Sequence, residues 1–206
     1  MPANFTGEYF GHSPIITCNC RVSRASKKRK YLNGRINYTL DLSAPYETLV
    51  KDYKENTQRN IEKSQKHNCS IKDCGVAEFL EFSNSHLEGL NSYNFQIFSR
   101  LIAETSERKL ARIEKAVDAN GEILSVACFL VWNMRIFYLA GASSPKGKQV
   151  SSMFLVFDKL IRDFASTGYL IDFEGSMIPG VARFFSGFGA KSFYYYHLKK
   201  YLFFYR

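Results

Sequence analysis

The chain has 206 residues, 46% of them hydrophobic and 16% aromatic, so it is long enough to bury the core of one domain. Its formal net charge is +9, but residues 1–35 hold seven bases against one acid, while residues 36–206 hold 21 bases against 18 acids. This distribution argues against an extended basic face of the kind that binds nucleic acid. The segment RASKKRK at 24–30 favours either a solvated loop or a small phosphate-binding cluster.

No stretch approaches the roughly 18 consecutive apolar residues of a membrane span, and the N-terminus has no basic segment followed by an apolar one. We therefore expect a cytoplasmic protein without a span. The five cysteines are scattered and include no C-x-x-C pair. This pattern predicts reduced thiols, with neither a disulfide framework nor a metal site.

The first third of the chain divides into an arm and a helical lead-in. Residues 1–35 show no sustained period, which predicts an irregular basic arm. Residues 36–42 alternate as a strand does, and Ser43 followed by Pro45 predicts a helix start. Apolar residues then recur at helical spacing as far as position 68, so we expect one long amphipathic helix there.

The rest of the chain alternates between strand and helix patterns. Asn120-Gly121 lies between two strand-like runs and predicts a hairpin with a type I′ turn. In chain order, the patterns predict a strand at 69–74, two helices from Gly75 to about position 105, a three-strand meander ending at 143, a helix at 150–164, a strand at 169–174, a helix at 178–189 and one or two final strands.

The order of these elements resembles the GNAT fold of acyl-CoA-dependent N-acyltransferases, an α+β or α/β fold with a mixed, mostly antiparallel sheet flanked by helices. Three segments are similar to the FemAB-like branch of that superfamily: TLDLSAPYETLVKDYKENTQRNIEKSQK, FYLAGASSPKGKQVSSMFLVFDKLI and IDFEGS with PGVARFFSGFGA. The resemblance implies a GNAT-like domain at 36–206, with a strand and lead-in helix at 36–68 and the core at 69–206. Two-half FemAB-like proteins are longer, so residues 1–35 would be the arm or the remnant of a first half.

A phosphate cradle is predicted where the loop after residue 142 enters a helix. Free N–H groups, the positive end of the helix dipole and two lysines would favour an anion there. The candidates for binding acetyl-CoA or another acyl-CoA are Gly141, Ser143, Lys146, Gly147, Lys148, Gln149 and Ser151. Many GNAT enzymes have Arg/Gln-x-x-Gly-x-Gly/Ala here, whereas this loop has no second glycine, and the alternative is a plain loop with exposed lysines.

Two carboxylates are predicted beside the acyl group. In a GNAT arrangement the strand at 169–174 diverges from the strand ending at Gly141, and alternation puts Asp172 and Glu174 on one face. Their repulsion would raise a pKa and suit a general base, although capping or ion pairing is the competing interpretation. Gly141 would mark a bulge or a close backbone approach. Tyr138, or a tyrosine of the run 194–196, could protonate the departing thiolate.

Three functions remain open from the sequence. The first is transfer of an acyl group, with acetyl as the expected group, from acyl-CoA to the amine of a small molecule or a cell-wall precursor. The FemAB-like resemblance implies the second, aminoacyl transfer from a charged tRNA in peptidoglycan synthesis, which the low charge of residues 36–206 disfavours. The third is a non-catalytic GNAT-like binding module. The aromatic C-terminus could bury itself in a homodimer or form a strand at the edge of its own sheet.

Overall fold

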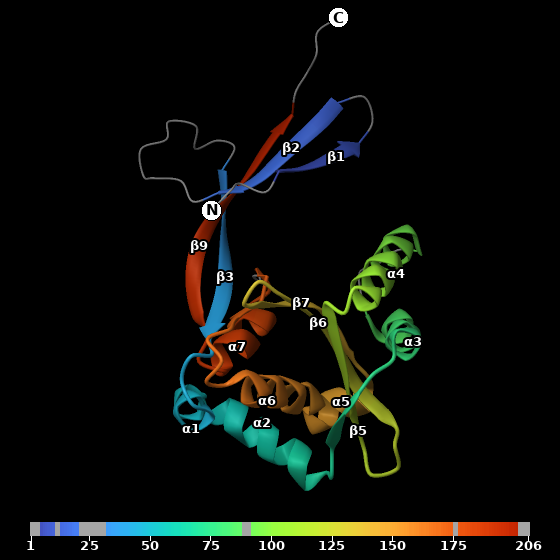
Figure 1. Cartoon of the computed structure of the whole chain (residues 1–206), viewed down its shortest axis with the longest axis vertical. Coiled ribbons are helices and arrows are strands. Elements are labelled where there is room, and N and C mark those ends of the chain that lie inside the picture. Colours follow the sequence, from blue (N-terminus) through green and yellow to red (C-terminus); the bar gives the residue numbers. More distant parts are fainter. Residues whose placement is uncertain (1–4, 11–12, 21–31, 88–91, 175–176, 202–206) are drawn as a thin grey trace, which may run out of the picture.

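The computed structural model describes residues 5–10, 13–20, 32–87, 92–174 and 177–201 (Figure 1). Its strands form one nine-stranded sheet in the order β1-β2-β9-β3-β8-β7-β6-β5-β4. Only the pair β7 and β8 is parallel, so the predicted mixed, mostly antiparallel sheet is confirmed. The strands are β1 (Phe5–Phe10), β2 (Ser13–Cys20), β3 (Leu32–Asp41), β4 (Ser70–Asp73), β5 (Ala111–Val117), β6 (Ile123–Trp132), β7 (Arg135–Ser143), β8 (Leu170–Asp172) and β9 (Lys191–Tyr201).

Helices cover both faces of the sheet (Figure 1). The helices are α1 (Tyr46–Leu49), the 3-10 helix η2 (Val50–Asp52), α2 (Glu55–Lys66), α3 (Val76–His86), α4 (Ser92–Glu107), α5 (Pro145–Val150), α6 (Ser152–Phe164) and α7 (Pro179–Gly187). On one face α6 and α7 enclose a core around Phe129, Phe157 and Phe185. On the other, α3 and α4 enclose a smaller core around Phe79 and Ile102. No helix in the part of the chain that the structure describes has the length and apolar character to cross a membrane.

The meander has two tight turns of different kinds. At the β5–β6 hairpin Gly121 has φ +85°, but Asn120 is not among the described residues with positive φ, so the predicted type I′ turn is wrong although the hairpin is confirmed. Asp118 instead accepts the N–H of Gly121 on its carbonyl and those of Asn120 and Glu122 on its carboxylate. Asn133 and Met134 have φ +49° and +57°, which is the type I′ pattern, at the β6–β7 turn.

The single long helix predicted after Pro45 is wrong, because the chain extends at Tyr53 between η2 and α2. Two tertiary contacts hold that break. The N–H of Lys54 donates to the carbonyl of Gly187 at 2.9 Å, and the buried Tyr53 hydroxyl donates to the buried Asp158 carboxylate on α6 at 3.2 Å. Ser43 does not cap the helix either, since its hydroxyl and N–H both donate to Asp41. These long-range bonds override the local helical pattern.

The prediction of an irregular arm is wrong for residues 5–10, 13–20 and 32–35, which form β1, β2 and the start of β3. β2 pairs antiparallel with β9, a strand close to 180 positions later in the sequence, so its partner could not be read from local periodicity. The basic segment 24–30 and residues 202–206 lie outside the described residues. The boundary at position 35 and the C-terminal dimer contact stay predictions.

Candidate active site

The parallel strands β7 and β8 separate after the first three residues of β7. Their pairing ends at Phe137 and Asp172, whereas β7 continues to Ser143 in register with β6. The chain leaves β8 because Glu174 has φ +58° and its N–H donates to the Asp172 carboxylate at 3.0 Å. From Tyr138 onward β7 therefore has a strand neighbour on one side only, and the predicted divergence of these two strands is present in the structure.

A cavity of about 780 Å³ lies along the free side of β7. Its volume falls within the range of small-molecule sites, and its lining is mostly apolar with a few polar groups. The described lining residues are His86 and Leu87 at the end of α3, Tyr138, Gly141, Ala142 and Ser143 on β7, Gly147, Lys148 and Ser151 around α5, Met153 and Phe154 on α6, and Gly180, Val181, Phe184 and Phe185 on α7. The cavity thus joins the consecutive elements β7, α5 and α6 to α3, which precedes them, and to α7, which follows them.

A bulge in β7 shapes the floor of the cavity. Cys128 and Phe129 of β6 oppose Ala140 and Tyr138, which leaves Leu139 as the extra residue. Tyr138 and Gly141 lie close together across this bulge. A Cβ at Gly141 would lie 2.5 Å from the Tyr138 hydroxyl oxygen. Burial raises the pKa of Tyr138, so its hydroxyl stays neutral and can donate a hydrogen bond. The sequence predicted a bulge or close approach at Gly141, and the extra residue of the bulge is Leu139, two positions earlier.

The junction of α5 and α6 forms one end of the cavity. Ser144 caps α5 by accepting the N–H of Gly147 at 3.0 Å. A Cβ at Gly147 would lie 1.9 Å from the carbonyl oxygen of Leu124, so only glycine lets α5 approach β6 this closely. Ser151 adopts a left-handed conformation with φ +62° and begins α6. This turn brings the start of α6 and the side chain of Lys148 to the cavity.

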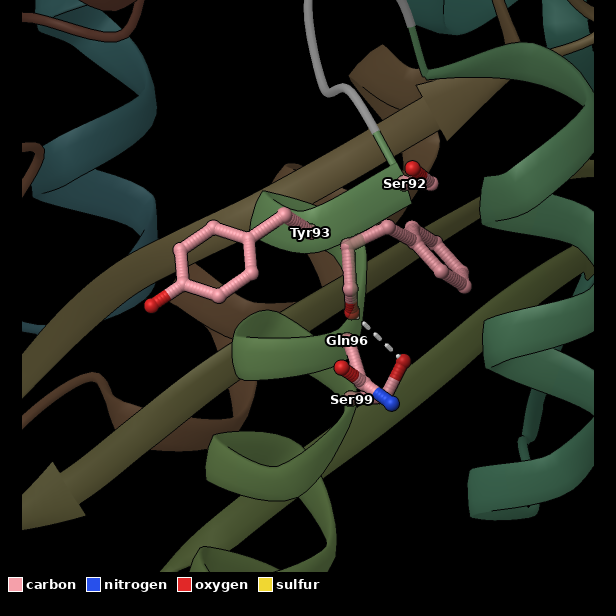
Figure 2. A pocket seen from close by; sticks show the side chains of 5 residues that line it. Ser92, Tyr93, Gln96 and Ser99 are labelled. Carbon is pink, nitrogen blue, oxygen red and sulfur yellow. Dashed lines mark hydrogen bonds between the residues drawn. The ribbon is translucent and has the colours of Figure 1, made fainter.

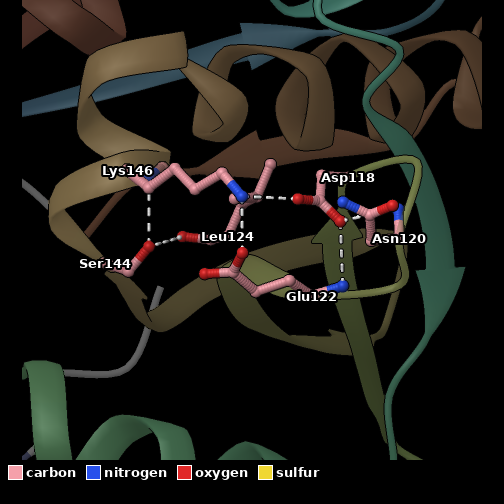
Figure 3. Close-up of polar contacts among 7 residues, drawn as sticks. Asp118, Asn120, Glu122, Leu124, Ser144 and Lys146 are labelled. Atoms are coloured by element: carbon pink, nitrogen blue, oxygen red, sulfur yellow. Dashed lines mark hydrogen bonds and ion pairs between the residues drawn. The ribbon is translucent and has the colours of Figure 1, made fainter.

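The two lysines of the predicted cradle lie in different places. Lys148 lines the cavity, whereas Lys146 points to the β5–β6 hairpin (Figure 3). Its ammonium group contacts Asp118 at 2.6 Å and Glu122 at 2.5 Å, and hydrogen bonds to these two acids raise the pKa of Lys146. Among the other candidates Gly141, Ser143, Gly147 and Ser151 line the cavity, and Gln149 is exposed outside it.

The two carboxylates at the end of β8 have different environments. Asp172 is buried, accepts a hydrogen bond from the Asn37 amide at 2.8 Å and pairs with Arg135 at 3.0 Å. Glu174 is exposed, and desolvation followed by the nearby Asp172 charge raises the pKa of Glu174, while Arg135 opposes the rise. Strand alternation does not extend to Glu174, and neither carboxylate is among the cavity-lining residues that the structure describes.

A second hollow lies at the start of α4 (Figure 2). Ser92, Tyr93, Phe95, Gln96 and Ser99 line it, so one helix supplies all of its described walls. No charged side chain of the described residues converges on it, which makes it a poor site for chemistry. Cys69, Cys74 and Cys128 are free thiols, and no group of potential metal ligands occurs among the described residues.

The sequence did not predict His86 as part of the site. It is half-buried at the last position of α3, and its ring packs 4.5 Å from that of Phe82. No motif surrounds it, and the fold alone brings it to a cavity formed by residues more than 50 positions later. Of the tyrosines that the sequence offered on β9, Tyr194 and Tyr196 are exposed and do not line the cavity.

The GNAT fold is a mixed sheet in which one parallel pair of strands separates beside a cavity, with a helix beginning at that cavity. This chain has the GNAT fold. Among solved structures, FemX superposes with a TM-score of 0.64 at 12% identity, over 84% of this chain and 63% of that chain. The chain therefore spans less than two thirds of the length of FemX. No protein-family model matches the sequence, and no curated protein does.

Two further solved structures agree on the fold. The C-terminal domain (DUF2156) of a putative lysylphosphatidylglycerol synthetase from Agrobacterium fabrum gives a TM-score of 0.53 at 11% identity, over 83% of this chain and 62% of that chain. A GCN5-related glucosamine N-acetyltransferase region of a fungal multi-domain GH3 β-N-acetylglucosaminidase gives 0.51 at 11% identity, over 85% of this chain and 23% of that chain. At these identities the likeness concerns the fold.

Proposed function

We propose that the protein is an acyltransferase that moves an acyl group, acetyl in the simplest case, from acyl-CoA to an amine. The observation that carries this proposal is the cavity at the separation of β7 and β8, which combines an apolar wall with Lys148 and the start of α6 at one end. Such a slot suits a ligand with a long uncharged arm and an anionic head. The pantetheine arm and the diphosphate of CoA have this chemistry.

The residues have distinct roles in this proposal. Lys148 and the first N–H groups of α6 would hold the diphosphate, because a helix N-terminus and a cation both favour an anion. The missing side chain at Gly141 lets the Tyr138 hydroxyl lie against the strand on the cavity lining. Backbone N–H groups on the free side of β7 would stabilise the tetrahedral oxyanion, and the neutral Tyr138 hydroxyl would protonate the thiolate. Asp172 serves as an ion-paired support for the end of β8.

A charged tRNA is the competing donor that the FemAB-like resemblance implies. Binding tRNA depends on neutralising many phosphates and so on a broad basic surface. Among the described residues, only Lys148 and His86 bring basic side chains to the cavity. This small number favours acyl-CoA as the donor.

Calorimetric titration with acetyl-CoA tests the proposal. We expect saturable binding by the unmodified protein and, for Lys148→Glu, a loss of affinity on the order of tenfold or more, because the reversed charge repels the diphosphate. Lys146→Glu is the matched control, since Lys146 lies outside the cavity. The affinity of this variant for acetyl-CoA should stay within about threefold of that of the unmodified protein. No binding of acetyl-CoA or CoA at millimolar concentration would contradict the proposal.

A further inference from the structure

Residues that pack against the cores on both faces of the sheet line the cavity. Tyr138, Met153 and Phe184 on its lining pack against the core under α6 and α7. Leu87 and Ala142, also on the lining, pack against the core under α3 and α4. Because these two cores lie on opposite faces of one sheet, the cavity passes the free side of β7 from one face to the other. A donor and an acceptor could therefore approach the same point of β7 from opposite faces.

The donor end of this passage is set by the α5–α6 junction, where Lys148 and Ser151 line the cavity. The other end is the C-terminus of α3, with His86 and Leu87. Three titratable side chains occur among the described lining residues: Tyr138, Lys148 and His86. Burial raises the pKa of Tyr138, so its hydroxyl stays protonated and is not a base, and an ammonium group is not a base either. His86 is the one member of this set whose side chain offers a ring nitrogen that can accept a proton.

The surroundings of His86 keep its ring in place without removing it from the cavity. Its ring contacts Phe82 one turn earlier on α3, with 54° between the ring planes. Glu78 and Glu81 of α3 line a neighbouring hollow together with His86, and Glu78 is bonded to Lys115 of β5 at 2.5 Å. Lys148 of α5 shares the cavity with it, and the described residues of β6 and β7 that line either hollow carry no charge.

We propose that the acceptor amine enters from the α3 face and that His86 is the catalytic residue that takes its proton. This inference rests on the proposed function. The amine nitrogen adds to the thioester carbonyl carbon, forming the C–N bond, and one N–H proton passes to the imidazole. The intermediate then collapses, the C–S bond breaks and the sulfur leaves with the electron pair. The sulfur takes up one proton from water, or from Tyr138, which then regains a proton from solvent. The imidazolium releases its proton to solvent, and the starting state is restored.

S-bromoacetyl-CoA tests the placement of His86 without a known acceptor. Its bromomethyl carbon occupies the place of the acetyl methyl group. An imidazole nitrogen facing that carbon displaces bromide, forms a C–N bond and loses its ring proton to solvent. We expect peptide mass spectrometry to locate the label on His86, and an excess of CoA to suppress it. A parallel reaction with iodoacetamide, which lacks the CoA part, identifies undirected alkylation of cysteines.

Two variants complete the test. His86→Gln should lose the directed label while it still binds acetyl-CoA, and His67→Gln should keep it, since His67 is exposed just beyond α2. Binding of acetyl-CoA with no directed label on His86, or with the label on another side chain, would overturn the role of His86 and leave the proposed function intact. Failure of the unmodified protein to bind acetyl-CoA would overturn both proposals.

Discussion

Replacing Gly147 by Ala is expected to lower the free energy of unfolding by about 3 kcal/mol. The new methyl group would lie 1.9 Å from the carbonyl oxygen and 2.7 Å from the carbonyl carbon of Leu124. Those atoms belong to the backbone of β6 in the middle of the sheet, so they cannot rotate away as a flexible side chain can. The strain falls on α5, which would have to move off the sheet and would carry Lys148 with it.

Urea unfolding followed by circular dichroism measures this effect. Gly180→Ala is the matched control, because Gly180 also lies in a helix and lines the same cavity, yet a Cβ there meets nothing within 4 Å. We expect that control to change the free energy of unfolding by less than about 1 kcal/mol. Equal stabilities of the two variants would contradict the close approach of α5 to β6.

The substitution Asp172→Ala removes a buried carboxylate and is expected to lower the free energy of unfolding by about 2 kcal/mol. The change leaves the Asn37 amide and the N–H of Glu174 without their acceptor, and it leaves Arg135 without its ion-pair partner. The expected loss is smaller than for a fully buried ion pair, because a third of the Arg135 side chain is exposed and water screens its charge. Differential scanning calorimetry at pH 7 gives the measurement.

Glu174→Ala is the comparison for Asp172→Ala. It removes the other carboxylate that the sequence predicted at this site, and Glu174 is exposed. Its free energy of unfolding should stay within about 0.5 kcal/mol of the unmodified protein. If Asp172→Ala left stability unchanged but abolished turnover with acetyl-CoA and an amine, Asp172 would be a base, and its assignment as a support for β8 would be wrong.

Much of the fold could be predicted because its signals are local. The turn residues near Gly121 and Asn133 and the alternation of β6 and β7 specify the meander from neighbouring positions alone. The break between η2 and α2 and the strand β2 depend on partners far along the chain. Local periodicity carries no information about such partners, so those elements were predicted wrongly.

The site was only partly predictable for a related reason. Gly141 and Gly147 can be recognised in the sequence because a glycine beside a strand end often marks a close approach. Which of two nearby lysines faces the cavity depends on the acids of the β5–β6 hairpin, which hold Lys146. His86 reaches the cavity through the packing of α3 on the sheet, and no pattern around it indicates this.

The central claim is that the gap between β7 and β8 holds the donor, and hydrogen exchange of the protein with and without saturating acetyl-CoA tests it most directly. We predict slower amide exchange in residues 138–143 of β7 and in residues 148–154 across the α5–α6 junction, with no change in the hollow at the start of α4. Bound acetyl-CoA that left both segments unprotected, or that protected α4 instead, would contradict the account.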